Sequence, residues 1–208
     1  MFTDALIITA LFSIFAISHT VFASYKFKKS IAEKLGNKIA FYRLFYNISA
    51  TLLFVFVYFV SPKPDYVIYD LNFPFDILIV VLQIFAGIAL LRITKFIDIW
   101  EFAGIKQVKR YLEGTYKSDD LDEKYELRED GPFKYTRHPI YLFSSLFLML
   151  RPTMDFFYLI FLINMVLYFY IGSYFEEKKL ITIFGNRYIE YQKKVPKIFP
   201  NLKLWLKK

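Results

Sequence analysis

Five apolar runs divide the chain, and they constrain its fold more than any other feature. They cover residues 4–24, 44–61, 75–94, 139–151 and 153–175. A helix of about 20 apolar residues crosses the hydrocarbon core of a bilayer. The fourth run is short, because its apolar stretch from Ile140 to Leu150 is only 11 residues long. The sequence therefore predicts an all-α integral membrane helical bundle of about five transmembrane helices, in which helices 4 and 5 form a tight helical hairpin.

The composition agrees with a membrane protein and limits its chemistry. Of the 208 residues, 56% are hydrophobic, whereas ordinary soluble domains have roughly 45–50%. A chain this short cannot bury that excess internally. It has no cysteine, which excludes disulfides, zinc–thiolate sites and a cysteine nucleophile. A signal peptide is the alternative for residues 4–24, but no basic segment precedes this run and it lacks an obvious small-residue cleavage site.

The distribution of lysine and arginine predicts how the chain crosses the membrane. Segments 25–43, 95–138 and 176–208 hold 6, 9 and 9 of these residues, whereas 61–74 and 151–153 hold one each. Basic connecting segments stay on the cytoplasmic side. We therefore expect an N-terminus outside, and a C-terminus inside, a bacterial or archaeal cytoplasmic membrane. The concentration of lysine and arginine in the cytoplasmic segments also explains the net charge of +8, so this charge does not require a nucleic-acid partner.

Two segments outside the apolar runs also have apolar residues at helical spacing. We expect an interfacial helix over residues 96–112 and a cytoplasmic C-terminal helix in the basic tail that starts at Glu176. The acidic stretch between them, residues 118–126, is typical of a solvated loop. Both helices would lie on the same side of the membrane as the N-terminal end of the fourth run.

A polar loop turns into an apolar helix at residues 131–141, Gly-Pro-Phe-Lys-Tyr-Thr-Arg-His-Pro-Ile-Tyr. Pro139 suits the first turn of a helix, so Arg137 and His138 fall at a helix N-terminus. Unpaired N–H groups and a partial positive charge there favour an anionic or zwitterionic ligand. The alternative is that Arg137 and His138 only anchor the helix at the membrane interface.

Two carboxylates, Glu176 and Glu177, follow the fifth apolar run. Alone, they would only mark where the last helix leaves the membrane. A hairpin of helices 4 and 5 brings them close to Arg137 and His138. Charged groups near hydrocarbon are costly unless they are paired or serve a ligand, so this corner is the predicted polar pocket.

These motifs together resemble the isoprenylcysteine carboxyl methyltransferase and phospholipid methyltransferase superfamily of integral membrane methyltransferases. The resemblance rests on four elements in order: Gly131…Arg137-His138-Pro139-x-Tyr141, the hydrophobic hairpin, Glu176-Glu177, and Phe184-Gly185…Tyr188…Tyr191…Val195-Pro196. It implies one membrane methyltransferase domain over residues 1–208, with a site for S-adenosylmethionine formed by 125–141 and 176–199.

The front half of the chain resembles the methanethiol S-methyltransferase sub-group and related membrane proteins associated with nitric oxide reduction. The matching features are His19, Asp98…Glu101…Gly104-Ile105-Lys106-Gln107-Val108 and Arg151-Pro152-Thr153-Met154. With this sub-group included, the resemblance implies a set of cofactor-binding residues and no metal. The set is Gln107, Tyr125, Leu127, Arg128, Phe133, Arg137, His138, Pro139, Tyr141, Glu176 and Glu177.

Methyl transfer to a thiol requires alignment and a base. Transfer from a sulfonium is an in-line displacement, and alignment of two bound reactants contributes roughly 7–11 kcal/mol. A free thiol, with a pKa of about 8.5, is mostly protonated at neutral pH. His19 and Glu101 are the candidate bases, and Arg137 supplies positive charge. The alternatives are a helix–helix hydrogen bond for His19 and an ordinary interfacial charge for Glu101.

One departure bears on the methyl acceptor. The prenylcysteine enzymes have a substrate-contacting arginine a few residues before the glutamates, whereas residues 171–175 contain none. This favours a small hydrophobic or thiol substrate that enters from the lipid bilayer. The alternatives are methylation of a phospholipid or an isoprenylcysteine carboxylate, or a non-enzymatic accessory role in nitric oxide reduction. The sequence does not predict an oligomeric state.

Overall fold

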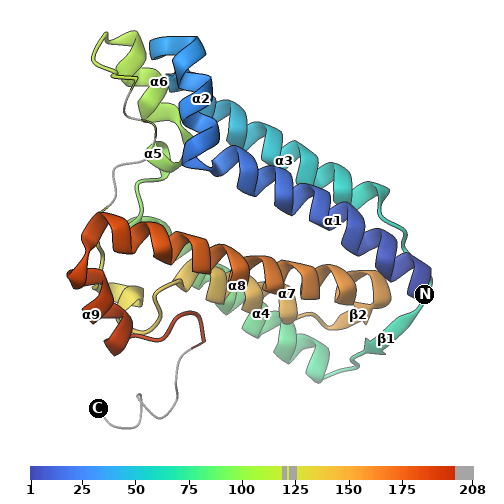
Figure 1. Cartoon of the computed structure of the whole chain (residues 1–208). Helices are drawn as coiled ribbons and strands as arrows, with labels where there is room; N and C mark the ends of the chain where they lie inside the picture. Colours follow the sequence, from blue (N-terminus) through green and yellow to red (C-terminus); the bar gives the residue numbers. More distant parts are fainter. Residues whose placement is uncertain (119–120, 122–125, 200–208) are drawn as a thin grey trace. The chain divides into compact units, whose positions relative to one another are not determined.

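The computed structural model describes residues 1–118, 121 and 126–199, and helices dominate it (Figure 1). The α-helices are α1 (Phe2–Ala23), α2 (Tyr25–Leu35), α3 (Tyr42–Val60), α4 (Phe75–Ile93), α5 (Ile99–Ala103), α6 (Ile105–Leu112), α7 (Pro139–Met149), α8 (Phe156–Phe184) and α9 (Asn186–Lys194). Short 3-10 turns are η1 (Gly36–Phe41), η2 (Thr94–Phe96) and η3 (Gly131–Lys134), and the strands are β1 (Val67–Asp70) and β2 (Thr153–Asp155).

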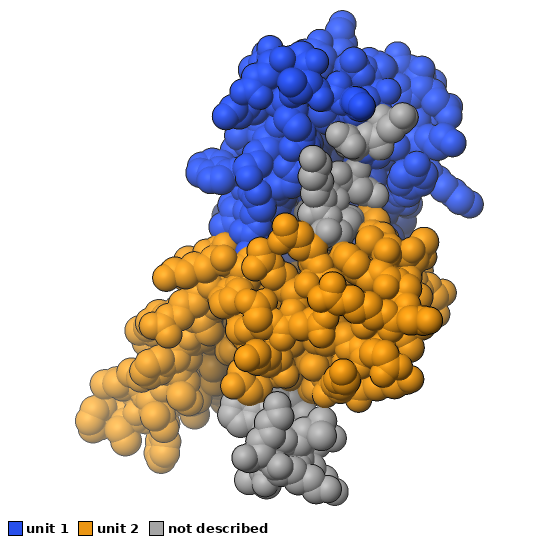
Figure 2. Space-filling model, turned by 90° about the vertical axis from the view of Figure 1, so that its left-hand side faces the viewer, with its two compact units in different colours: residues 1–63, 97–125 blue, residues 64–96, 126–208 orange. Residues whose placement is uncertain are grey.

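Four helical stretches in the described part of the chain are long and apolar enough to cross a membrane, and α7 is a shorter apolar helix. They are Phe2–Ala23, Tyr25–Val60, Phe75–Phe96 and Phe156–Phe184. The prediction of an all-α integral membrane bundle is confirmed. The chain divides into two compact units, residues 1–63 with 97–125 and residues 64–96 with 126–208 (Figure 2).

The first unit is built on α1 and α3, which pack side by side (Figure 1). Ser24 caps the start of α2, because its hydroxyl accepts a hydrogen bond from the Phe27 N–H. The single helix predicted for residues 96–112 is wrong, because the chain breaks into α5 and α6 at Gly104. Gly104 has φ +91°, and a side chain there would meet the Leu44 backbone nitrogen at 2.5 Å. This close approach fixes α5 against the start of α3.

The second unit packs α7 most extensively against α4, and α7 also contacts α8. β1 and β2 pair antiparallel beside the connection between α7 and α8. α8 continues to Phe184, beyond the end of the fifth apolar run at residue 175, and α9 begins only at Asn186, so the prediction that a separate tail helix starts at Glu176 is wrong. Side chains at the end of α8 explain the extension, because they pack on α9. The packed residues are Leu127, Leu180, Ile181, Phe184, Tyr188, Tyr191 and Val195.

The short α7 ends without leaving its last carbonyl groups unpaired. Gln83 Nε2 of α4 donates to the Phe147 carbonyl at 2.9 Å, and the Tyr158 hydroxyl of α8 donates to the Leu148 carbonyl at 2.9 Å. The Arg151 N–H donates to the Met149 carbonyl at 3.0 Å. A helix end in a low-dielectric environment needs such partners, because water is not available to replace them. These bonds explain how an 11-residue helix ends inside an apolar bundle.

We expect Gln83→Leu to lower the free energy of unfolding by about 1 kcal/mol, the usual strength of a hydrogen bond between membrane helices. Unfolding in detergent micelles with increasing SDS measures this loss. Thr51→Val is the matched control, because the Thr51 hydroxyl donates only to the Asn47 carbonyl of its own helix. Equal stability of the two variants would contradict the assigned role of Gln83.

Candidate active site

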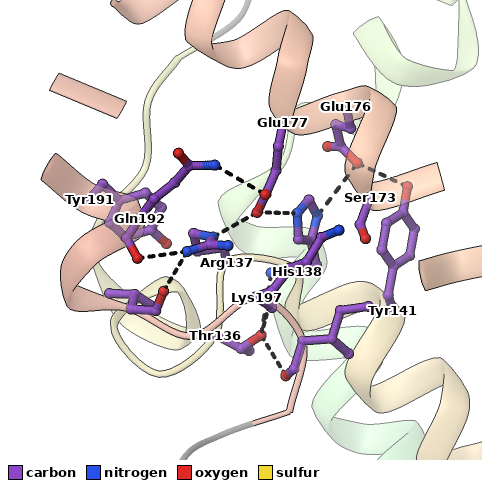
Figure 3. A network of polar contacts seen from close by, with 12 residues as sticks. Thr136, Arg137, His138, Tyr141, Ser173, Glu176, Glu177, Tyr191, Gln192 and Lys197 are labelled. Carbon is purple, nitrogen blue, oxygen red and sulfur yellow. Dashed lines mark hydrogen bonds and ion pairs between the residues drawn. The ribbon is translucent and has the colours of Figure 1, made fainter. Parts of the chain in front are cut away.

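The loop before α7 places its side chains through two local features. Gly131 adopts φ +53°, and a side chain there would collide with the Phe96 ring. Pro139 occupies the first turn of α7, where backbone N–H groups have no intrahelical partner, so the missing N–H of proline costs no hydrogen bond. Arg137 and His138 therefore come directly before the helix, as predicted, and both point toward α8 (Figure 3).

Glu177 of α8 is the centre of the polar cluster. Its Oε1 lies 2.7 Å from Arg137 Nε and 3.2 Å from His138 Nε2. Its Oε2 accepts a hydrogen bond of 3.0 Å from Gln192 Nε2 of α9. Only 11% of the Glu177 side chain is exposed. The carboxylate is therefore occupied by protein groups and holds three segments of the chain together.

Arg137 has further partners on the chain that leaves α9. Its Nη1 donates to the Gln192 and Val195 carbonyls, both at 2.8 Å. Its backbone N–H donates to the Pro196 carbonyl at 3.0 Å, and the next N–H, of His138, donates to the Lys197 carbonyl at 3.1 Å. Segment 136–138 and the chain at 196–198 thus run beside one another (Figure 3). The guanidinium fastens this C-terminal segment over the start of α7.

Glu176 differs from its neighbour because 42% of its side chain is exposed. Its Oε2 accepts a 2.9 Å hydrogen bond from the Tyr141 hydroxyl and lies 3.5 Å from His138 Nδ1. The His138 and Tyr141 rings are stacked at 5.3 Å, and the Phe169 ring continues the stack at 5.2 Å from Tyr141. An accessible carboxylate beside aromatic faces can bind a cationic or hydrogen-bond-donating ligand.

His138 lies between the two carboxylates, and this controls its protonation. Burial disfavours the charged imidazolium, but hydrogen bonds to Glu176 and Glu177 outweigh burial and raise the pKa of His138 above 6.5. A proton bound more tightly in the folded state stabilises that state. The contribution is complete below about pH 6.5 and is lost as the pH rises through the raised pKa.

We expect the wild type to lose stability relative to His138→Gln as the pH rises above about 6.5, because only the wild type holds this proton. Thermal unfolding in detergent at several pH values measures the difference. All other titrating groups, including His19, are common to both proteins and cancel. A difference that stayed constant or grew with rising pH would show that the carboxylates do not hold a protonated His138.

The other predicted cofactor-binding residues near this loop have separate surroundings. Leu127 packs into the apolar cluster between α8 and α9. Arg128 pairs with Glu126 at 2.9 Å, and both side chains are exposed. The Phe133 carbonyl accepts a 2.6 Å hydrogen bond from the Tyr191 hydroxyl, and Pro139 is fully buried. Tyr125 lies outside the described residues.

His19, Glu101 and Gln107 belong to the first unit. The Glu101 carboxylate is buried and is held by Arg110 at 2.9 Å through both oxygens and by Gln107 Nε2 at 3.1 Å. His19 Nε2 lies 2.6 Å from the Tyr46 hydroxyl. The structure therefore joins Glu101 to Gln107, and it joins Arg137, His138, Tyr141, Glu176 and Glu177 in the second unit.

A hollow of about 320 Å³ lies elsewhere in the second unit. It is lined by residues such as Asp70, Asp76, Pro152 and Thr153. These residues lie at β1, β2 and the start of α4, toward the C-terminal end of α7, whereas the polar cluster lies at its N-terminal end. The hollow holds none of the clustered groups, so the polar cluster remains the candidate active site.

Sequence reasoning missed Gln192, Tyr46 and Arg110. Gln192 reaches Glu177 only because the chain breaks at Gly185, where φ is +57°, and returns along α8. Gly185 was the available signal for that turn. Tyr46 and Arg110 become partners of His19 and Glu101 through packing of separate helices, and no local motif indicates such contacts.

The apolar helices define an integral membrane protein, and the cluster of Arg137, His138, Glu176 and Glu177 gives it a charged site at the start of an apolar helix. The family model for phospholipid methyltransferases matches residues 82–187, just over half of the chain, and this range contains both sides of the cluster. The chain belongs to the phospholipid methyltransferase family. It is a membrane methyltransferase, an enzyme that takes a methyl group from a donor.

Proteins named methanethiol S-methyltransferase are similar to the chain over most of its length. Methanethiol S-methyltransferase 1 of Bradyrhizobium diazoefficiens is 30% identical, with 95% of this chain and 67% of the relative covered. The enzyme of Pseudomonas deceptionensis is 26% identical, with coverage of 98% and 74%. The enzyme of Mycobacterium tuberculosis is 25% identical, with coverage of 91% and 75%. No solved structure matches the chain.

Proposed function

We propose that the chain transfers a methyl group from S-adenosylmethionine to a small thiol of the methanethiol type. The observation that carries this proposal is the polar cluster at the start of α7, where an accessible Glu176 adjoins the buried Glu177–Arg137–His138 group. Similarity to methanethiol S-methyltransferases over more than nine-tenths of the chain supports the thiol acceptor. Phospholipid and prenylcysteine methylation are the competing activities within the same family.

The polar side chains of this cluster fit the polar end of S-adenosylmethionine, which carries an ammonium and a carboxylate beside its sulfonium. Glu176 is the carboxylate with exposed surface, and Tyr141 fixes its orientation at 2.9 Å. We propose that Glu176 holds the ammonium or a hydroxyl of the cofactor and that the His138–Tyr141 face lies along it. When bound, the cofactor supplies a methyl group that is already activated for transfer.

We propose for Arg137 a role different from the catalytic one that the sequence predicted. Its side chain is 10% exposed, and its Nε and Nη1 are directed to protein oxygens. Moving it toward a ligand would leave a buried Glu177 carboxylate unpaired, which is costly. We therefore propose that Arg137 and Glu177 position His138 and the C-terminal segment, while Glu176 and His138 contact the cofactor.

Of the two candidate bases, the surroundings favour His19. Glu101 is held by two hydrogen bonds from Arg110 and one from Gln107, so taking up a proton would disrupt a buried ion pair. His19 Nε2 contacts the Tyr46 hydroxyl at 2.6 Å, and a hydroxyl can accept a hydrogen bond from a protonated ring. We propose His19 as the group that accepts the thiol proton, with Gln107 and Glu101 fixing the α5–α6 elbow.

We also propose that the donor site faces the cytoplasm. Lysine and arginine are concentrated in the segments that flank it, 95–138 and 176–208, and such segments stay inside. A cytoplasmic site has direct access to S-adenosylmethionine, while a small apolar thiol can arrive from the bilayer. The N-terminus would then lie outside.

Product analysis tests the proposed function. The purified enzyme in detergent is incubated with methyl-labelled S-adenosylmethionine and, separately, methanethiol, a phosphatidylethanolamine and a prenylcysteine. We expect labelled dimethyl sulfide from the first acceptor and little transfer to the others. Transfer to the lipid or the prenylcysteine alone would replace the thiol with that acceptor, and absence of transfer to all three would favour an accessory role.

A further inference from the structure

Tyr46 of α3 meets His19 of α1 through two contacts within the first unit. The Tyr46 Oη lies 2.6 Å from His19 Nε2, and the same hydroxyl donates to the His19 carbonyl at 3.3 Å. The centroids of these two rings are 5.1 Å apart. The Phe15 ring also contacts the imidazole, with a centroid distance of 5.7 Å. His19 is thus an ionisable group inside an apolar helix, and its ring contacts the Tyr46 hydroxyl.

We propose that Tyr46 is a positioning residue that holds His19 as an imidazolium while the thiol is methylated. This inference rests on the proposed thiol methyltransferase function. In the protonated ring both nitrogens are donors. Tyr46 Oη then accepts the Nε2 hydrogen over 2.6 Å, and its own hydrogen points to the His19 carbonyl. The hydroxyl therefore offers the charged ring a hydrogen-bond acceptor at a fixed position.

The reaction step balances without another reagent. The thiol proton passes to His19, and the sulfur electron pair forms the new S–CH₃ bond. The S–CH₃ bond of the sulfonium donor breaks, and its electron pair stays on the donor sulfur, which becomes neutral. His19 later returns the proton to water. Placing a charge in an apolar span is expensive, so an acceptor for the imidazolium lowers the barrier of this step.

A purely structural role is the alternative, because side-chain hydrogen bonds also join membrane helices. Tyr42 provides a matched comparison. It lies one turn earlier on α3, stacks on Tyr46 at 6.4 Å, and donates its hydroxyl to the Phe22 carbonyl of α1 at 2.8 Å. Tyr42→Phe and Tyr46→Phe each remove one hydroxyl that joins the same two helices, but only the Tyr46 hydroxyl contacts His19.

Two methyl acceptors of nearly equal size distinguish a role of Tyr46 in proton transfer from a purely structural role. Methanethiol is mostly protonated at neutral pH, whereas methaneselenol is mostly ionised and needs no base. For Tyr46→Phe we expect kcat with methanethiol to fall by about tenfold or more, since general base catalysis contributes roughly 10²–10⁴-fold. With methaneselenol we expect kcat to change less than about twofold, because an acceptor that is already ionised gains nothing from general base catalysis. His19→Gln should give the same pattern, and Tyr42→Phe should slow neither acceptor.

The outcomes distinguish this inference from the proposed function. If the wild type methylates neither acceptor, the thiol methyltransferase function fails. If the wild type methylates both and Tyr46→Phe slows both equally, or slows neither, Tyr46 does not act through the proton of the thiol. A selective loss with methanethiol, at unchanged thermal stability, supports the inference.

Discussion

Glu177→Ala is expected to destabilise the folded protein by about 3–5 kcal/mol, the loss measured when one partner of a buried ion pair is removed. Arg137, 10% exposed, would keep its charge without its carboxylate. His138 and Gln192 would also lose their partner on α8. Because proteins are stable by only about 5–15 kcal/mol, this loss should lower the unfolding temperature strongly and release the C-terminal segment.

Two further variants make this prediction specific. Glu177→Gln keeps an acceptor for Gln192 but not the charge, so we expect an intermediate loss of stability. Glu190→Ala removes an exposed carboxylate of α9 that pairs only with Lys193 at 2.7 Å, and we expect no measurable change. Thermal unfolding of the purified proteins in one detergent compares all three. Glu177→Ala as stable as Glu190→Ala would mean that the buried network does not hold the site together.

Gly104→Ala is expected to destabilise the first unit by about 2–5 kcal/mol. The left-handed backbone at φ +91° costs a residue with a side chain roughly 1–2 kcal/mol. The added methyl group would also meet the Leu44 backbone nitrogen at 2.5 Å, and such overpacking costs roughly 1–3 kcal/mol more. The added carbon is bonded to the Gly104 backbone and the nitrogen belongs to the Leu44 backbone, so the clash can be relieved only by moving one of the two main chains.

Gly114→Ala separates the two contributions. Gly114 also has a positive φ, +69°, but no atom lies within 4 Å of the position that its added carbon would occupy. We therefore expect Gly114→Ala to cost only the backbone contribution, about 1–2 kcal/mol. Denaturant titration in detergent compares the two. Equal losses would show that α5 does not press against the start of α3.

The polar cluster was largely predictable, because chain connectivity forces it. A short apolar pair of helices must return to the side from which it started, and this places residues 137–138 beside 176–177. The allocation of roles within the cluster was not predictable. Glu176 and Glu177 are adjacent and identical, yet one is 42% exposed and the other 11%. That difference depends on the rotation of α8 relative to α7.

The limits of the helices were less predictable than their existence. Charges at 176–179 suggested that the last helix ends, but apolar contacts of Leu180 and Phe184 with α9 keep it continuous to Phe184. Apolar spacing suggested one helix over 96–112, but the contact between Gly104 and Leu44 breaks it. In both cases packing between distant segments overrides a local pattern.

Equilibrium binding of labelled S-adenosylmethionine to Glu176→Gln tests most directly whether the start of α7 and the C-terminal third of α8 form the donor site. Glu176 is partly exposed, so the variant should fold, and Glu190→Gln is its surface control. Loss of a charged hydrogen bond of about 1.5–3 kcal/mol predicts binding weaker by about tenfold or more. Affinity equal to that of the wild type and the control would place the methyl donor elsewhere.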